Sequence, residues 1–390
     1  MSDSLRVAPS VIVLGGHVDA AWVAEELLAI GYQVSWVWTE ELPDAPIAGC
    51  CATFPNCQLI GFTGHAGGFV LRIRSADQQI DLSASAIVIA TGNEREFIPE
   101  RYGLEPDPHI ISTRQLRDRL ATPRQVRNLP LERQQHILFA LDMSGLSGKE
   151  ATVETLQLAV QTRRTRHCEV SVLYRELQVD SDQLESLTRQ MRAQGIVFHR
   201  LTAEMPVIGE HGVSVNHADG SMQADLLVLP ETAQPRKDNH ELADLLQLTL
   251  GTDGYLQELN VHYYRPGLVN RKGIFLAGRC HLDIDESGAR ADAMQAAANV
   301  DALLHTGWLV PEDVIAHVDS HKCIRCLTCI RTCPHIAVEL ARYEQLTAAR
   351  VVDVACRGCG ACVANCPVQA IELVGPMVPA WLQAANVYEG

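Results

Sequence analysis

The sequence predicts an α/β chain in which a two-lobed, Rossmann-like body precedes a small α+β domain at the C-terminus. Three observations carry this prediction. A β-α-β pattern opens the chain, two later apolar runs end in glycine near residues 92 and 278, and eight of the 13 cysteines fall between residues 323 and 366. Strands that alternate with helices are typical of a parallel sheet, and a local concentration of cysteine indicates a metal or cluster site.

The opening pattern starts with an apolar run, SVIVLGG, at residues 10–16. Apolar residues then recur with helical spacing over residues 19–30, and a second strand-like run follows at residues 34–38. This order is the opening of a dinucleotide-binding fold. The pyrophosphate of a nucleotide would face the backbone N–H groups of Gly15, Gly16 and the start of the helix.

The glycine fingerprint of such folds is only partly present. It needs glycines at positions 15, 17 and 20, and the chain supplies Gly15, His17 and Ala20. At the end of the second strand, where an acidic residue would bind the ribose hydroxyls, Glu40 is the candidate substitute. From this motif alone, a nucleotide site and a plain turn before a helix remain equal alternatives.

Two later runs favour the nucleotide site. Residues 86–92, AIVIATG, form a buried strand that runs into a Thr-Gly turn, and residues 273–278, GIFLAG, form another strand that ends in glycine. An aspartate and an alanine-rich helix over residues 287–304 follow. This order resembles the glutathione-reductase-like flavoproteins, in which such residues contact the ribityl and phosphate groups of the flavin. The candidate residues are Thr91, Gly92, Gly278 and Asp283.

The cysteine-rich segment contains two copies of the pattern C-x2-C-x2-C-x3-C-P. In bacterial ferredoxins of this kind, the first three cysteines of a run bind one cubane and the fourth binds the other cluster. The pattern therefore predicts two 4Fe-4S clusters with crossed ligands. We name the predicted ligands the first cysteine set, Cys323, Cys326, Cys329 and Cys366, and the second cysteine set, Cys356, Cys359, Cys362 and Cys333.

The alternative for these cysteines is a pair of zinc sites, because C-x2-C is also zinc spacing. The chain has two complete copies of a four-cysteine pattern, each ending in Cys-Pro, so iron–sulfur clusters are the preferred interpretation. The first run departs from the ferredoxin pattern in one respect. It has Arg325 and Leu327 where ferredoxins often place glycine, whereas the second run keeps Gly358 and Gly360.

Taken together, these segments resemble the HdrA-like family, which comprises the flavin- and iron–sulfur-containing subunits of heterodisulfide reductase and their quinone-interacting and benzoyl-CoA-reductase-associated relatives. The resemblance rests on residues 15–34, on the Ala-Thr-Phe-Pro stretch before Cys57, on residues 86–92 and 274–304, and on the double cysteine run. It implies a thioredoxin-reductase-like flavoprotein fold that holds FAD and passes electrons to two fused clusters. The expected partners are other redox subunits of such a complex, and further candidates are a ferredoxin or a membrane quinone-reactive subunit.

The resemblance also implies a division into domains. The FAD-binding lobe is expected at residues 1–125 and 209–310, an inserted pyridine-nucleotide-like lobe at 126–208, the ferredoxin domain at 311–375 and a C-terminal tail at 376–390. Within the insert, Gly148-Lys149 resembles a phosphate loop only in part, because the four-residue gap and the following Ser or Thr are missing. The sequence therefore argues against NAD(P) binding there.

Composition narrows the remaining choices. A net charge of −15 disfavours nucleic acid and anionic membranes as partners, and no run approaches the roughly 18 apolar residues of a spanning helix. We therefore expect a cytoplasmic protein that reaches a membrane only through partners. Cys50, Cys51 and Cys57 lack C-x2-C spacing and are expected to be small apolar residues, although a cluster or a redox pair remains an alternative.

The leading hypothesis is an electron-transfer subunit that relays electrons between a flavin and two 4Fe-4S clusters. No nucleophile or acid–base group for organic chemistry stands out, so the substrate site is expected on a partner chain. Two alternatives stay open. One is a flavin-less iron–sulfur scaffold, and the other is a ferredoxin-dependent NAD(P) oxidoreductase.

Overall fold

The computed structural model of the chain consists of two compact units. The first contains Met1–Gly92, Pro235–Leu282 and Gly288–Gly390, and the second contains Asn93–Gln234 and Asp283–Ser287. The structure describes residues 4–39, 52–75, 78–121, 136–141, 148–166, 168–177, 182–201, 206–209, 212–218, 220–259, 266–343 and 346–375.

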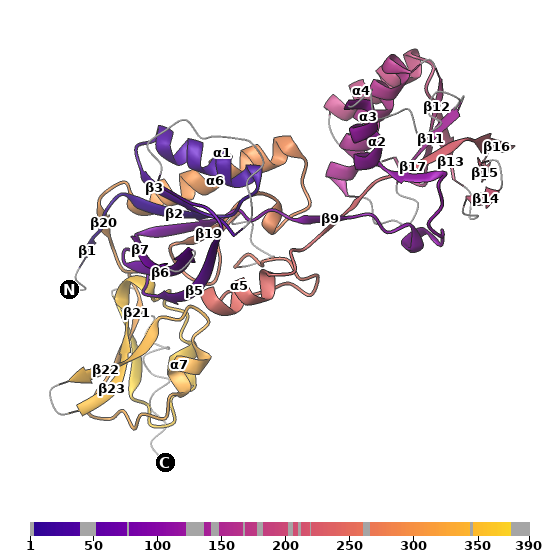
Figure 1. The fold of residues 1–390 in the computed structure, drawn as a ribbon. Helices are drawn as coiled ribbons and strands as arrows, with labels where there is room; N and C mark the ends of the chain where they lie inside the picture. Colours follow the sequence, from indigo (N-terminus) through magenta and orange to yellow (C-terminus); the bar gives the residue numbers. More distant parts are fainter. Residues whose placement is uncertain are drawn as a thin grey trace. The chain divides into compact units, whose positions relative to one another are not determined.

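A five-stranded parallel sheet forms the centre of the first unit (Figure 1). Its order is β19 (Ile274–Leu276), β8 (Ala86–Ile89), β2 (Ser10–Leu14), β3 (Gln33–Val37) and β4 (Ala52–Phe54). After β2, the chain adds β3 and β4 on one side of this strand and then adds β8 on its other side. The order therefore reverses between β2 and β8, and such a switch point is where open α/β sheets bind ligands, beyond the carboxyl ends of the strands.

Two helices and an antiparallel layer accompany this sheet. Helix α1 (Val18–Ala29) buries Ala20, Val23, Ala24 and Leu27 as the apolar spacing predicts, and α6 (Glu286–Leu304) is the predicted alanine-rich helix. The antiparallel layer consists of β5 (Cys57–Thr63), β6 (Phe69–Ser75) and β7 (Gln78–Ala84). A short pair, β1 (Leu5–Arg6) with β20 (Trp308–Leu309), and helix α5 (Asn239–Leu246) complete this part.

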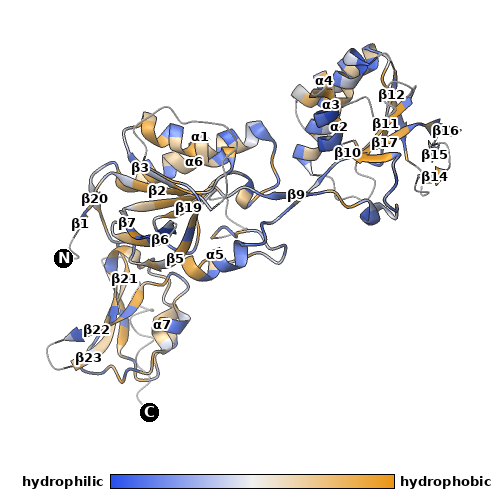
Figure 2. Cartoon of the chain, in the orientation of Figure 1, coloured by the Kyte–Doolittle hydropathy of each residue, from blue (hydrophilic) through white to orange (hydrophobic). Residues whose placement is uncertain are grey.

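The second unit has its own five-stranded parallel sheet, in the order β10 (Ile110–Ser112), β17 (Leu226–Leu229), β11 (His136–Leu141), β12 (Glu169–Tyr174) and β13 (Val197–Arg200). Figure 2 shows its strands as largely hydrophobic, whereas its helices also carry hydrophilic residues. The helices are α2 (Thr113–Ala121), α3 (Lys149–Thr165) and α4 (Asp182–Ala193). Its short strands are β9 (Glu94–Glu96), β14 (Val207–Gly209), β15 (Gly212–His217), β16 (Gly220–Ala224) and β18 (Thr232–Gln234).

The second unit extends beyond the predicted insert, 126–208, on both sides. The reason lies in the sheet, because β10 and β17 flank the predicted segment in the sequence and pair with each other and with β11. Within the predicted insert, β11, α3 and β12 follow one another along the chain.

The cysteine-rich domain lies in the first unit and has an internal two-fold repeat. Strand β21 (Ile315–Val318) pairs with β24 (Ile371–Val374), and β22 (Val338–Tyr343) pairs with β23 (Leu346–Val351). Helix α7 (Thr328–Thr332) carries part of the first cysteine run and α8 (Ala361–Ala364) part of the second. Within the described part of the chain, no helix is long and apolar enough to cross a membrane. The predicted tail, 376–390, lies outside the described residues.

Candidate functional site

The first cysteine set lines one cavity in the cysteine-rich domain. Cys323, Cys326 and Cys329 come from the segment between β21 and β22, and Cys366 comes from the turn after α8. The second cysteine set lines another cavity, to which the run after β23 contributes three thiols and Cys333, at the end of α7, the fourth. The fold thus brings the eight cysteines together in the two crossed groups that the spacing predicts.

The two groups differ in their exposure to solvent. In the first set only Cys329 is buried, whereas Cys323 and Cys366 are half-buried and Cys326 is exposed. In the second set only Cys359 is exposed, and the other three thiols are buried. The second cavity is therefore the better protected of the two.

Backbone N–H groups point at the sulfur atoms in the same way in both halves of the repeat. Ala337 N donates to Cys333 Sγ at 3.4 Å, and Ala370 N donates to Cys366 Sγ at 3.2 Å. Ala316 N and Ala349 N donate to Cys356 and Cys323, each at 3.5 Å. Such bonds stabilise negative charge on cluster sulfur and are a means of tuning the potential. The donors fit the predicted clusters.

Electrostatic repulsion among the thiols also favours a metal centre in the second cavity. Burial, together with the neighbouring Cys333, Cys356 and Cys359, raises the pKa of Cys362 to about 12. Four thiolates in one cavity repel one another, so they are held together only when a metal centre supplies compensating positive charge. Cys333 of the first run is one of the thiols near Cys362 of the second run, as expected if the two runs exchange their fourth cysteines.

The backbone explains the departure in the first run. Gly358 and Gly360 have φ values of 63° and 77°, and the corresponding Arg325 and Leu327 have 56° and 62°. Both runs thus follow the same left-handed path, which is open to glycine and costs other residues about 1–2 kcal/mol each. Arg325 and Leu327 thus adopt the backbone conformation of the two glycines at the cost of backbone strain. Backbone strain of this kind is concentrated at functional sites.

The second cavity is the one whose lining residues touch the loop before β19. His335 Nδ1 lies 2.9 Å from the carbonyl oxygen of Asn270, and the Asn270 amide donates to Pro334 O at 3.0 Å. The Arg357 guanidinium donates to Val269 O at 3.3 Å. His335 and Arg357 both line the second cavity. These bonds join the second cysteine set to the Rossmann-like part of the same unit.

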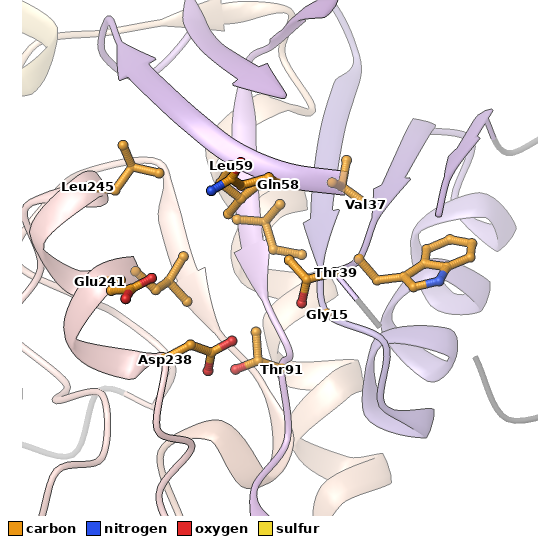
Figure 3. A pocket seen from close by; sticks show the side chains of 12 residues that line it. Gly15, Val37, Thr39, Gln58, Leu59, Thr91, Asp238, Glu241 and Leu245 are labelled. Carbon is orange, nitrogen blue, oxygen red and sulfur yellow. The ribbon is translucent and has the colours of Figure 1, made fainter. Parts of the chain in front are cut away.

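A further cavity of about 240 Å³ lies at the carboxyl ends of β2, β3 and β8, which is the switch point of the sheet. Gly15, Trp38 and Thr91 line it from the strand ends, and Asp238 and Glu241 line it from α5 (Figure 3). The Thr91 hydroxyl is buried and, within the described part of the chain, has no hydrogen-bond partner. A buried hydroxyl of this kind calls for a partner such as water or a ligand.

Gly15, Gly16 and Gly92, three of the residues predicted to contact a flavin, lie in close-packed turns. Gly15, at φ 137°, packs so closely that an added Cβ would lie 2.3 Å from Ala90 O, and Gly16 packs against Trp38. Gly92, at φ 73°, lies against the ring of His17. Glu40 lies outside the described residues, as do Cys50 and Cys51.

The structure does not bring Gly278 and Asp283 into one unit. Gly278 follows β19 in the first unit, whereas Asp283 belongs to the second, where an added Cβ on Gly148 would lie 1.5 Å from its carboxylate. Their common role in contacting a flavin therefore stays a prediction.

Sequence reasoning missed one buried charge, Asp19, in the first turn of α1. Its side chain has no exposed surface. It accepts a hydrogen bond from Arg279 N at 2.8 Å and forms an ion pair with the Arg279 guanidinium. Burial alone would raise the pKa of Asp19, but the hydrogen bond and charge of His17 and the charge and N–H of Arg279 outweigh it and hold the pKa below its usual value. Asp19 is therefore an anion at neutral pH.

This pair predicts a pH-dependent loss of stability. Because the pKa of Asp19 is lower in the folded state than its usual 3.8, the pair contributes fully to the free energy of unfolding above that value and is lost as pH falls through the folded pKa. We expect Asp19→Asn to lower the free energy of unfolding by about 3 kcal/mol at pH 7 and to weaken its acid dependence. Urea unfolding between pH 3 and pH 7 measures both.

The matched control is Asp81→Asn, which breaks the Asp81–Arg72 pair on the surface. Solvent screens that pair, so we expect little change in stability. Equal losses for Asp19→Asn and Asp81→Asn would contradict the structural role of the buried pair.

The three described cysteines outside the two sets are all buried. Cys280 and Cys168 are buried, and burial raises the pKa of both thiols, so neither resembles a reactive thiolate. Cys57 is also buried, and its thiol donates to Pro55 O at 3.3 Å. The expectation that Cys57 is a small apolar residue agrees with this placement.

Comparisons with known proteins bear on both parts of the site. Residues 316–373 match the family model of the 4Fe-4S dicluster domain. A protein of Archaeoglobus profundus, named for its likeness to the A-type subunit of heterodisulfide reductase, is 33% identical over 122 residues, which are 31% of this chain and 17% of that protein. The corresponding component of the ferredoxin:CoB-CoM heterodisulfide reductase of Methanosarcina mazei is 26% identical over 279 residues, which are 66% of this chain and 35% of that protein.

Over part of its length, the chain is similar to the HdrA component of heterodisulfide reductases. The predicted resemblance is thus confirmed, and the cysteine-rich segment of this chain matches the 4Fe-4S dicluster domain. The matches span well under half of the length of these relatives. A solved structure, the thioredoxin reductase of T. acidophilum, covers 75% of this chain and 97% of its own, with a TM-score of 0.48 and 11% identity.

Proposed function

We propose that this chain is a single-electron relay in a heterodisulfide-reductase-like assembly, with two 4Fe-4S clusters as its carriers. One observation carries the proposal. Eight cysteines line two cavities, four to each, inside the segment that matches the dicluster domain. When bound, such clusters accept and release one electron at a time, and two clusters in one small domain form a short path for electrons.

The proposed ligands are the first and second cysteine sets, each with three cysteines of one run and the fourth cysteine of the other. The Ala316, Ala337, Ala349 and Ala370 N–H groups would stabilise the charge of the cluster sulfurs. The second set is the better protected, and residues beside its cavity bond to the Rossmann-like part, so we assign it to the inner end of the path.

The first set is the outer end. Ile324 and Leu340 line its cavity, and they are 58% and 48% exposed. Exposed apolar side chains beside a redox centre are suited to contact with another protein. We propose another redox subunit of the assembly as that partner. The names of two relatives mention ferredoxin, and one of them also mentions F(420)H(2). A ferredoxin and a membrane quinone-reactive subunit are therefore further candidate partners. A cytoplasmic location would keep the thiols reduced.

A relay that also contains FAD is the second candidate function, and the cavity with the unpartnered Thr91 hydroxyl favours it. FAD would convert an electron pair into single electrons. The phosphate end of the site does not fit this group, however, because the Asp19 carboxylate already takes the Arg279 N–H beside the start of α1. The proposed relay therefore runs through the two clusters alone.

Anaerobic purification of the whole chain tests the proposal. We expect about eight iron atoms and eight sulfides per chain and two one-electron steps in a redox titration followed by electron paramagnetic resonance. Iron near four per chain, or zinc in its place, would contradict a two-cluster relay. Reduction of the clusters by NADPH alone would favour a pyridine-nucleotide reductase instead.

A further inference from the structure

The start of α1, which follows the first strand of the sheet, is the place where a Rossmann-like fold receives a phosphate, and the turn after β19 lies against it. Free N–H groups and the positive end of a helix dipole favour an anion there. In this chain, the anion at this place is a side chain. Asp19 lies in the first turn of α1, has no exposed surface and accepts a hydrogen bond from Arg279 N at 2.8 Å.

The carboxylate leaves no room for a second anion between these two elements. An added Cβ on Gly278 would lie 2.4 Å from Asp19 Oδ2, so the turn packs directly on the carboxylate. The Arg279 side chain, 5% exposed, closes over the other oxygen as an ion pair. Ion pairing inside the protein thus takes the place of an external phosphate.

A second carboxylate, that of Asp292, accepts a hydrogen bond from the other N–H group of the same turn, that of Gly278. Gly278 N donates to Asp292 Oδ2 at 2.5 Å, and the same oxygen lies 2.9 Å from His281 Nε2. Glu258 lies 3.5 Å from the other ring nitrogen of His281. The N–H groups of Gly278 and Arg279 are therefore both engaged with carboxylates, and their surroundings are acidic. A pyrophosphate would meet like charge here.

His17 lies at the start of α1, between Asp19 and Gly92. It is the N-cap of α1, where the fingerprint of dinucleotide-binding folds has its second glycine. Its ring lies against Gly92, and its Nδ1 is 3.2 Å from Asp19 Oδ1. The glycine at this position normally lets a pyrophosphate approach the backbone, and an imidazole ring occupies that space in this chain.

We propose that Asp19 is a built-in anion that fills the phosphate cradle of this sheet, so that the chain excludes a flavin dinucleotide from the position its fold provides. The nearby cavity at Thr91 and Trp38 is thereby left for a ligand without a pyrophosphate, or for water. The inference concerns the Rossmann-like sheet and is independent of the two clusters.

Flavin titration of the purified, cluster-loaded chain tests the inference. We compare the wild type with Asp19→Asn, which removes the negative charge but keeps the size of the side chain and leaves the Arg279 cation for a phosphate. We expect Asp19→Asn to bind FAD at least about ten-fold more tightly than the wild type. The substitution removes a negative charge that repels phosphate and leaves the Arg279 cation available to bind it. Quenching of FAD fluorescence measures the dissociation constant.

Two further variants make the result decisive. Asp19→Asn/Arg279→Gln removes the anion without leaving a buried cation, and it guards against a single variant that fails to fold. We expect its affinity for FAD to lie between those of the wild type and Asp19→Asn. Asp301→Asn removes a carboxylate of α6 that accepts from the Tyr32 hydroxyl, outside the cradle, and should leave affinity for FAD unchanged.

Two outcomes would overturn the inference. One is a wild type that purifies with about one FAD per chain or binds it as tightly as Asp19→Asn. The other is a weak wild type whose affinity none of the Asp19 variants improves. Iron content and cluster reduction, measured on the same samples, report on the proposed relay and stay unchanged in either case.

Discussion

Replacing Cys366 with serine is expected to remove the cluster of the first cysteine set and to leave the other in place. Although Cys366 belongs to the second run in sequence, it lines the first cavity together with Cys323, Cys326 and Cys329. Loss of one thiolate from a four-iron cluster usually makes its binding much weaker. We expect iron to fall from about eight to about four atoms per chain, and one of two electron paramagnetic resonance signals to disappear.

The reciprocal variant, Cys333→Ser, distinguishes crossed from uncrossed ligands. It should remove the other signal, that of the second set, because Cys333 lines the second cavity. Cys168→Ala is the matched control, since Cys168 is a buried thiol outside both cavities and its loss should leave the iron content at the wild-type value. If Cys366→Ser abolished the signal that Cys356→Ser abolishes, the ligands would not cross.

Gly358→Ala is expected to destabilise the dicluster domain by about 3 kcal/mol or more. A left-handed φ of 63° strains any residue with a Cβ, and the added atom would lie 2.3 Å from Val314 O, so the backbone beside β21 would have to move. Val314 precedes Ala316, whose N–H donates to Cys356. The shift should therefore also speed the loss of iron from the second cavity. Denaturant unfolding and iron release to a chelator measure the two effects.

Gly360→Ala is the control for this variant. Gly360 has a similar φ, 77°, but an added Cβ would lie 3.6 Å from Leu373, which is ordinary contact. We expect a loss of only about 1–2 kcal/mol, from backbone strain alone. Equal losses for the two variants would show that the contact with Val314 carries no cost of its own.

The clusters could be predicted from the sequence because their pattern is local. Three of the four ligands of each set lie within seven residues of one another, and the turn geometry that joins them is a property of the same short run. The parallel sheet was predictable for a similar reason. Its first strand, helix and second strand follow each other, with apolar residues at the spacing that each element needs.

The phosphate cradle could not be predicted in this way. Asp19 and Arg279 are 260 residues apart, and each alone reads as an ordinary polar residue beside a glycine turn. Only the ion pair between them shows that the phosphate position, whose glycine fingerprint is partly lost, is already occupied. A signal was nevertheless present, since an acidic residue in the first turn of α1 is unusual where a phosphate is to bind. The wider bounds of the second unit were missed because β10 and β17 join its sheet from outside the segment with the clearest pattern.

The unequal protection of the two cysteine sets has a consequence for the lifetime of the protein in air. Oxygen and chelators reach a cluster through solvent, and three of the four thiols of the first set are exposed or half-buried, against one of the second. Decay should therefore proceed in two stages, with the outer cluster lost early and the inner one persisting. A sample handled briefly in air would then hold a half-loaded chain, with its docking end disabled while its inner carrier still takes up electrons.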